Sequence, residues 1–165
     1  MKIFVNEYEY TFDVISESIS AWWRRKYNFK KGCINSVLLA LLIFLISLYK
    51  ERWMLFAALI PLPFLYIIFI LQKMKMAVKL EKEKIKVIFP DSVPILQVEI
   101  GEDICMITPK SETRVQFSDI EDIIVTKNLI ILMVKGMMTV TLAKRGFKQG
   151  NAGECLEHLK EHIRK

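Results

Sequence analysis

The sequence predicts an α+β membrane protein, in which a two-helix transmembrane hairpin is joined to an antiparallel β-domain closed by a C-terminal helix. The hairpin is indicated by two charge-free apolar runs, Cys33–Tyr49 and Trp53–Leu71, which only Lys50-Glu51-Arg52 separates. As helices these runs would reach roughly 25 and 28 Å, close to the thickness of a bilayer's hydrocarbon core. The β-domain is indicated by short apolar runs between turn residues after residue 78.

The charge distribution orients this hairpin. The net charge is +6, yet residues 78–165 carry 14 basic and 13 acidic side chains. The excess lies beside the spans, at Arg24, Arg25, Lys26, Lys30 and Lys31 before the first and at Lys73 and Lys75 after the second. By the positive-inside rule, both termini are cytoplasmic in a multi-pass protein of the inner cell membrane. The lipid bilayer is therefore the expected partner, and nucleic acid is not, because nucleic-acid binders gather their charge on the folded domain.

Residues 1–31 are predicted to form an N-terminal strand region and an interfacial helix. Ile3–Val14 is rich in β-formers and predicts one or two strands, after which Ser16 or Ser18 would cap a helix. Aromatic and basic side chains follow together, as is typical of a helix lying at the inner leaflet. An amphipathic helix packed on the soluble domain is the alternative. The candidate lipid or partner contacts here are Trp22, Trp23, Arg24 and Arg25.

Residues 32–76 are predicted to hold the hairpin, with spans at about 33–49 and 53–71. Neither span contains an ionisable residue, and the most polar members are Asn35, Ser36 and Ser47. Ion pathways and proton relays require such groups at depth, so the hairpin is expected to be an anchor. Pro61 and Pro63 predict a packing kink in the second span, with a functional hinge as the alternative.

Residues 77–165 are predicted to form the cytoplasmic domain of about seven short strands. A loop is expected from Gly146 to Gly153, followed by an amphipathic helix in which Ala152, Cys155, Leu156, Leu159 and Ile163 recur at helical spacing. The expected strands are a hairpin within Val78–Phe89, then Val93–Ile100, Ile104–Thr108, Arg114–Phe117, Ile120–Thr126, Leu129–Val134 and Met137–Leu142.

Several local motifs in this region resemble the bacterial YcxB-like family. They are FSDIEDI at 117–123, TKNLIIL at 126–132, LAKRGF at 142–147 and the helix with Leu156 and Leu159. The resemblance implies a two-span membrane protein whose cytoplasmic domain is similar to a pleckstrin-homology (PH) fold. The family often has a proline before the lysine of LAKRGF, where this chain has Ala143.

No stretch of the sequence indicates catalysis or a cofactor. Cys155, His158 and His162 lie three and four residues apart, so one helix could present them to a metal. Cys155 also fits the apolar stripe and no fourth ligand is evident, so no metal site is predicted. The sequence contains neither a glycine-rich phosphate loop nor a Gly-x-Ser-x-Gly motif. A disulfide framework is not expected from three cysteines, two of them in the cytoplasmic part.

The predicted function is therefore a membrane-anchored, non-enzymatic PH-like interaction module. It would bind a protein partner or lipid headgroups at the inner face of the membrane, and Lys144 and Arg145 are further candidate contacts. The alternative is a small two-span immunity protein that protects against a membrane-active peptide, in which the hairpin acts. An enzyme or metal-dependent module built on Cys155 and the histidines is a third, weaker hypothesis. No pattern specifies an oligomeric state.

Overall fold

The computed structural model describes residues 3–50, 61–90, 92–136 and 138–163. The chain divides into two compact units. Met1–Trp22 and Glu81–Lys165 together form the first unit, called the β-domain below, and Trp23–Leu80 forms the second, called the helical segment. The helical segment is thus inserted into the sequence of the β-domain.

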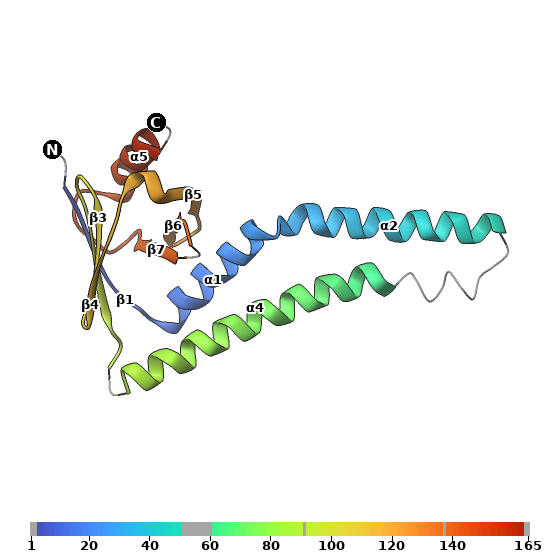
Figure 1. Cartoon of the computed structure of the whole chain (residues 1–165), viewed down its shortest axis with the longest axis horizontal. Helices are drawn as coiled ribbons and strands as arrows, with labels where there is room; N and C mark the ends of the chain where they lie inside the picture. Colours follow the sequence, from blue (N-terminus) through green and yellow to red (C-terminus); the bar gives the residue numbers. More distant parts are fainter. Residues whose placement is uncertain (1–2, 51–60, 91, 137, 164–165) are drawn as a thin grey trace. The chain divides into compact units, whose positions relative to one another are not determined.

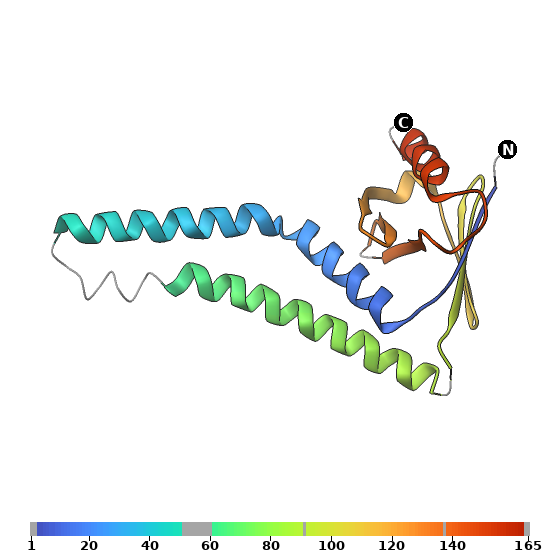
Figure 2. The same ribbon diagram turned by 180° about the vertical axis from the view of Figure 1, so that it is seen from behind.

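The β-domain contains two antiparallel sheets (Figures 1 and 2). The five-stranded sheet has the order β4-β3-β2-β1-β8, and the three-stranded sheet has the order β5-β6-β7. The strands are β1 (Phe4–Glu9), β2 (Ile95–Ile100), β3 (Ile104–Thr108), β4 (Ser111–Val115), β5 (Ile120–Val125), β6 (Leu129–Val134), β7 (Met138–Ala143) and β8 (Phe147–Gln149). The predicted antiparallel β-structure is confirmed, and β8 lies where a loop was expected.

The N-terminal strand β1 is an interior strand of the larger sheet. It pairs with β2 from Phe4 opposite Ile100 to Glu9 opposite Ile95, and with β8 on its other side. Its side chains alternate in burial, with Phe4, Asn6 and Tyr8 buried. Two strands almost 90 residues apart in sequence are therefore neighbours, and the whole helical segment lies between them in the chain.

The hydrophobic core fills the space between the two sheets and α5 (Ala152–Ile163). Asn151 begins this helix, since its Oδ1 accepts a hydrogen bond from the Glu154 N–H at 2.9 Å. Cys155 and Leu159 on α5 are fully buried, which confirms the predicted C-terminal helix. The other fully buried large side chains are Phe4, Ile15, Val98, Ile100, Ile104, Leu129, Ile130, Ile131, Leu132, Val140 and Leu142.

Helix α1 (Phe12–Lys26) follows β1 after two residues. The Thr11 hydroxyl accepts a hydrogen bond from the Val14 N–H at 3.5 Å, so Thr11 caps the helix. The prediction of a cap at Ser16 or Ser18 was wrong, because the helix begins before both serines. Ser18 is instead buried and donates to the Ile15 carbonyl at 3.1 Å.

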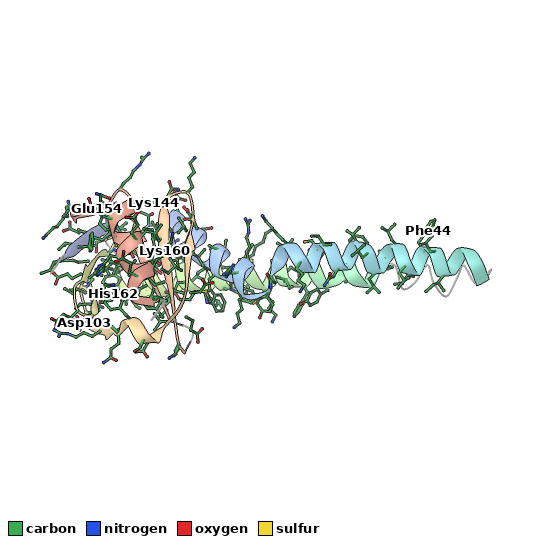
Figure 3. The ribbon with its side chains drawn as sticks, turned by 90° about the horizontal axis from the view of Figure 1, so that it is seen from above. Phe44, Asp103, Lys144, Glu154, Lys160 and His162 are labelled. Atoms are coloured by element: carbon green, nitrogen blue, oxygen red, sulfur yellow. The ribbon has the colours of Figure 1, made fainter. Side chains whose placement is uncertain are left out.

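Helix α2 (Phe29–Lys50) contains the first predicted span. The chain turns before it at Asn28, whose φ of 48° lies in the left-handed region that asparagine tolerates. Most apolar side chains of α2 between Ile34 and Ile46 are exposed, and Phe44 projects outward from the helix (Figure 3). A helix that is apolar on all sides is typical of a buried or membrane-spanning helix.

Helix α4 is described from Pro61 to Ile88. The tip Glu51-Arg52 and residues 53–60 of the second predicted span lie outside the described residues. The predicted hairpin within Val78–Phe89 was wrong, because α4 continues to Ile88. Lysine and glutamate favour helix, and Lys84 Nζ lies 3.9 Å from Glu81 Oε2, one turn earlier.

In the described part of the chain, no single helix is both long and apolar enough to cross a membrane. One bent pair of helices, Phe12–Lys26 with Lys30–Ile46, has the required length and composition, with a 53° bend between the two.

Candidate functional site

Two adjoining clefts lie in the β-domain around the last turns of α4, from Glu81 to Phe89. The first, called the sheet cleft, has a volume of about 380 Å³ and lies between α4 and strands of both sheets. The second has about 420 Å³ and lies between α4 and the residues that follow β1 and precede β2. They share the lining residues Tyr10, Ile85, Phe89 and Pro94.

The sheet cleft is lined by apolar side chains from α4 and from the sheet, together called the apolar wall below, and by hydroxyl groups. Among its apolar residues, Ile85 and Leu96 are each only 8% exposed. The apolar lining residues are Ile85, Ile88, Phe89, Pro94, Leu96 and Met106. The hydroxyl groups belong to Tyr8, Tyr10, Thr108, Ser111, Thr139 and Thr141. Such a lining is typical of a small-molecule site, in which a few polar groups orient a mainly apolar ligand.

Both tyrosines of the cleft are neutral at physiological pH. Burial, followed by the neighbouring Tyr10, raises the pKa of Tyr8 far above its ordinary value. Burial, followed by the Glu81 carboxylate, raises the pKa of Tyr10 to about 12. Each phenol therefore keeps its proton and is able to donate a hydrogen bond.

Lysine side chains lie at the rim of the clefts. Lys110 Nζ donates to the Ile88 carbonyl at 3.2 Å, which caps the C-terminal end of α4, and lies 5.2 Å from the centre of the Phe89 ring. Lys84 forms the ion pair with Glu81 already described. The other cleft is lined by Lys86, whose Nζ lies 5.3 Å from the centre of the Phe12 ring. Lys82 Nζ also lies near this ring, at 5.4 Å, but Lys82 does not line the cleft. The rim is therefore basic, with Glu81 as its one acidic lining residue among those described.

The contact residues predicted in α1 do not line either cleft. Trp22 and Trp23 are half-buried, and Arg24 and Arg25 are exposed. Trp23 stacks on Tyr27, with 4.9 Å between ring centres and 16° between ring planes. Their role as lipid or partner contacts stays a prediction.

The other two predicted contacts lie in the turn after β7. Lys144 is half-buried, its Nζ donates to the Thr126 carbonyl, and its N–H donates to the Asn128 carbonyl at 2.8 Å. Lys144 therefore holds this turn against the β5–β6 turn. Arg145 is exposed. Neither residue lines the clefts, and their contact role likewise stays a prediction.

The LAKRGF segment is explained by its contacts with β1. The buried Asn6 side chain donates to the Ala143 carbonyl at 2.8 Å and accepts from the Ala143 N–H at 3.0 Å. A proline at 143 would lack that N–H, so Ala143 suits the partner this chain provides. A Cβ on Gly146 would lie 2.5 Å from the Glu7 carbonyl oxygen, so only glycine fits there.

The Cys155, His158 and His162 side chains do not assemble a metal centre. Cys155 is fully buried, and burial raises the pKa of its thiol to about 12. The His158 and His162 rings lie 4.1 Å apart between centres, and the centre of the His162 ring lies 5.1 Å from that of Phe117. Within the described ranges, no group of three or more His, Cys, Asp or Glu side chains is placed to hold a metal ion.

Residues 100–159 match the family model described as YcxB-like protein. The chain carries a YcxB-like domain. This confirms the resemblance drawn from the motifs at 117–123, 126–132 and 142–147. The matched YcxB-like residues run from the end of β2 to Leu159 in α5, so they omit β1, the helical segment and nearly all of β2. No curated protein and no solved structure matches the chain significantly.

Sequence reasoning missed the two clefts of the β-domain. Their walls come from segments far apart in the chain: 8–12, 81–96, 106–111 and 139–141. No local motif marks such a site. The one available signal was the alternation Tyr8-x-Tyr10, which places both phenols on one face of the chain as it leaves β1.

Proposed function

We propose that this protein is a membrane-anchored, non-enzymatic interaction module, in which the helical segment anchors a PH-like domain at the inner face of the cytoplasmic membrane. The main observation in favour of anchoring is the exposure of large apolar side chains on α2 and on the first part of α4. Leu38, Leu42 and Leu45 are 58%, 54% and 60% exposed, and Leu65 and Phe69 are 53% and 56% exposed. Apolar surface of this extent requires an apolar surrounding, which the bilayer supplies.

The pairing of β1 with β2 supports a hairpin rather than a single crossing. These strands are hydrogen-bonded neighbours over six residue pairs, so the chain leaves and re-enters the β-domain on one side of the membrane. A segment that starts and ends on the same side crosses an even number of times. The bent helix pair alone would cross once. The apolar beginning of α4, together with the residues before it, is the natural second crossing.

The direction of insertion follows from the basic residues at both ends of the hairpin. Arg24, Arg25 and Lys26 form the last turn of α1, and Lys73 and Lys75 follow the apolar part of α4. Because positive charge is retained on the cytoplasmic side, this arrangement supports a β-domain on that side.

The form of the β-domain supports the PH-like assignment and a binding role. Two packed antiparallel sheets with a C-terminal helix agree with the fold that the YcxB-like resemblance implies. The cleft offers an apolar wall, neutral hydroxyl groups and ammonium groups. These groups recognise a ligand or a partner through burial, hydrogen bonds and charge.

The experiment that tests this function is a pull-down of the full chain from native membranes in mild detergent. The matched variant ends at residue 80 and keeps the helical segment without the rest of the β-domain. We expect a protein or lipid to be captured by the full chain and lost with the variant. Capture of the same molecule by both chains would contradict a binding role for the β-domain and would favour the protective function of the hairpin.

A further inference from the structure

We propose that the sheet cleft binds a single-chain anionic amphiphile, a fatty acid or a lysophospholipid, with its acyl chain on the apolar wall and its headgroup at the lysine rim. This inference rests on the proposed membrane anchoring, which keeps the β-domain beside a reservoir of such molecules and so raises their effective concentration.

The size and the walls of the cleft suit one acyl chain. Its volume of about 380 Å³ lies at the small end of the range of ligand pockets, about 300 to 1,000 Å³. Ile85 and Ile88 line it from α4, whereas Leu96 and Met106 line it from the sheet. Apolar groups therefore flank the space from two elements, and a chain lying between them would lose its contact with water on both sides.

The rim supplies the charge that an anionic headgroup requires. The Lys84 side chain is 65% exposed, and its Nζ lies 3.9 Å from the Glu81 carboxylate. Lys110 uses one N–H on the Ile88 carbonyl. An ammonium group has three N–H donors, so both lysines retain donors for a carboxylate or phosphate oxygen. Lys84 and Lys110 outnumber Glu81 among the charged lining residues of this cleft.

A small amphiphile fits better than a peptide added as a strand. The sheet strands β1, β2 and β3 that line the cleft each have a paired neighbour on both sides. The backbone groups of these three strands are therefore used within the sheet. Ser111 of β4 and Thr139 and Thr141 of β7 also line the cleft, and these two strands are sheet edges. Over β1, β2 and β3, recognition inside the cleft comes from side chains, and the cleft as a whole offers apolar, hydroxyl and ammonium groups.

The test uses the full chain in phosphatidylcholine nanodiscs with a twelve-carbon fatty acid that carries a photoactivatable diazirine at its chain end. Crosslinked residues are mapped by mass spectrometry. The cleft variants are Met106→Trp, which fills the apolar wall, and Lys84→Glu with Lys110→Glu, which reverses the rim charge. Lys148→Glu is the matched control, because Lys148 is 63% exposed on β8 and does not line the cleft. Thermal unfolding of each variant shows whether the β-domain is still folded.

We expect crosslinks within residues 81–111 of the wild-type chain, and a fall of about tenfold in both cleft variants, which corresponds to about 1.4 kcal/mol of binding. The control should match the wild type, and the uncharged diazirine alcohol of equal length should crosslink poorly. A lysophosphatidylglycerol probe in a parallel arm distinguishes the two sources of the headgroup. Equal labelling by acid and alcohol, or labelling unchanged in both folded cleft variants, would overturn the proposal. Absence of labelling at 33–49 in the same sample would contradict the anchoring, whichever result the cleft gives.

Discussion

The β-domain and the helical segment are both rich in large apolar side chains, but the β-domain buries them and the helical segment exposes many of them. In the β-domain, Ile100, Leu132 and Leu142 are each 0% exposed. In the helical segment, Leu38, Leu42 and Leu45 are all more than half exposed. Folding of the β-domain removes its apolar side chains from water. The exposed apolar side chains of the helical segment need an apolar surrounding instead. The anchoring proposal therefore depends on exposure and on strand pairing as much as on composition.

The largest expected effect comes from separating the two regions. A chain that joins residues 1–22 to 81–165 through a flexible glycine-serine linker should stay in solution without detergent and unfold cooperatively. The reason is that β1 keeps both of its neighbours, β2 and β8. The measurement is thermal unfolding followed by circular dichroism.

The matched control for that chain is residues 81–165 alone. Without β1, the larger sheet loses an interior strand and the buried side chains of Phe4 and Tyr8. We expect this fragment to show no cooperative transition. A fragment that unfolds as cooperatively as the joined chain would show that the β-domain does not need its N-terminal strand.

Two leucine substitutions compare a buried position of the β-domain with an exposed position of the helical segment. Leu132→Ala in β6 should lower the free energy of unfolding of the β-domain by about 2–5 kcal/mol, because it leaves a cavity in the core. Leu42→Ala in α2 should leave that free energy unchanged. Leu42→Lys should instead impair membrane insertion, by about 2.5–3.5 kcal/mol if the site lies at mid-bilayer. Urea unfolding and membrane flotation measure the two effects, and equal stability losses for both alanine variants would contradict the contrast.

A smaller effect is expected at the contact between β1 and β7. Asn6→Ala removes two hydrogen bonds to the half-buried Ala143 and leaves the Ala143 N–H without the amide oxygen that it donates to. The free energy of unfolding should fall by about 1–3 kcal/mol. Gln149→Ala, at an exposed position of β8, is the control and should be close to neutral. A neutral result at Asn6 would mean that the amide does not hold the two sheets together.

The smallest effect concerns pH. Burial alone would raise the pKa of Glu17, but hydrogen bonds from Thr126 and Asn128 and the nearby Lys144 outweigh it, so the pKa lies below its ordinary value. Because the folded pKa is lower than the unfolded one, the stabilisation is present above about pH 4.5 and is lost as pH falls through the folded pKa.

Glu17→Gln should therefore lower the free energy of unfolding by less than about 1 kcal/mol at neutral pH, since the carboxylate is partly exposed to water. The difference from the unmodified chain should shrink below pH 4.5. Urea unfolding of the joined chain at several pH values measures this difference. If the difference in free energy of unfolding between the two chains grew on acidification, the lowered pKa of Glu17 would be contradicted.

Local patterns in the sequence predicted local structure well in the β-domain. Ile104–Thr108 and Leu129–Val134 have the predicted bounds, because each is a continuous apolar run between turn residues. β8 was missed because three residues are too few to show alternation. Val78–Phe89 was misread because a lysine- and glutamate-rich run shows a strand-like alternation but favours helix.

Long-range features were beyond prediction from the sequence. The pairing of β1 with β2 joins strands on opposite sides of the helical segment, and nothing local to either strand encodes it. The sheet cleft depends on that pairing, because it places Tyr8 opposite Leu96, and both residues line the cleft. The candidate site therefore could not be predicted from the sequence without knowing how the strands pair.

The most direct test of the central claim is the side of the membrane on which each region is modified by a membrane-impermeant maleimide. Lys160→Cys places a thiol on the exposed face of α5, and Glu51→Cys places one in the predicted hairpin tip. The unmodified chain is the control for its own cysteines, of which Cys105 and Cys155 are buried. We expect Glu51→Cys to react in intact cells and Lys160→Cys to react only after permeabilisation. Reaction of both, or of Lys160→Cys alone, in intact cells would contradict a two-crossing anchor with the β-domain on the inner face.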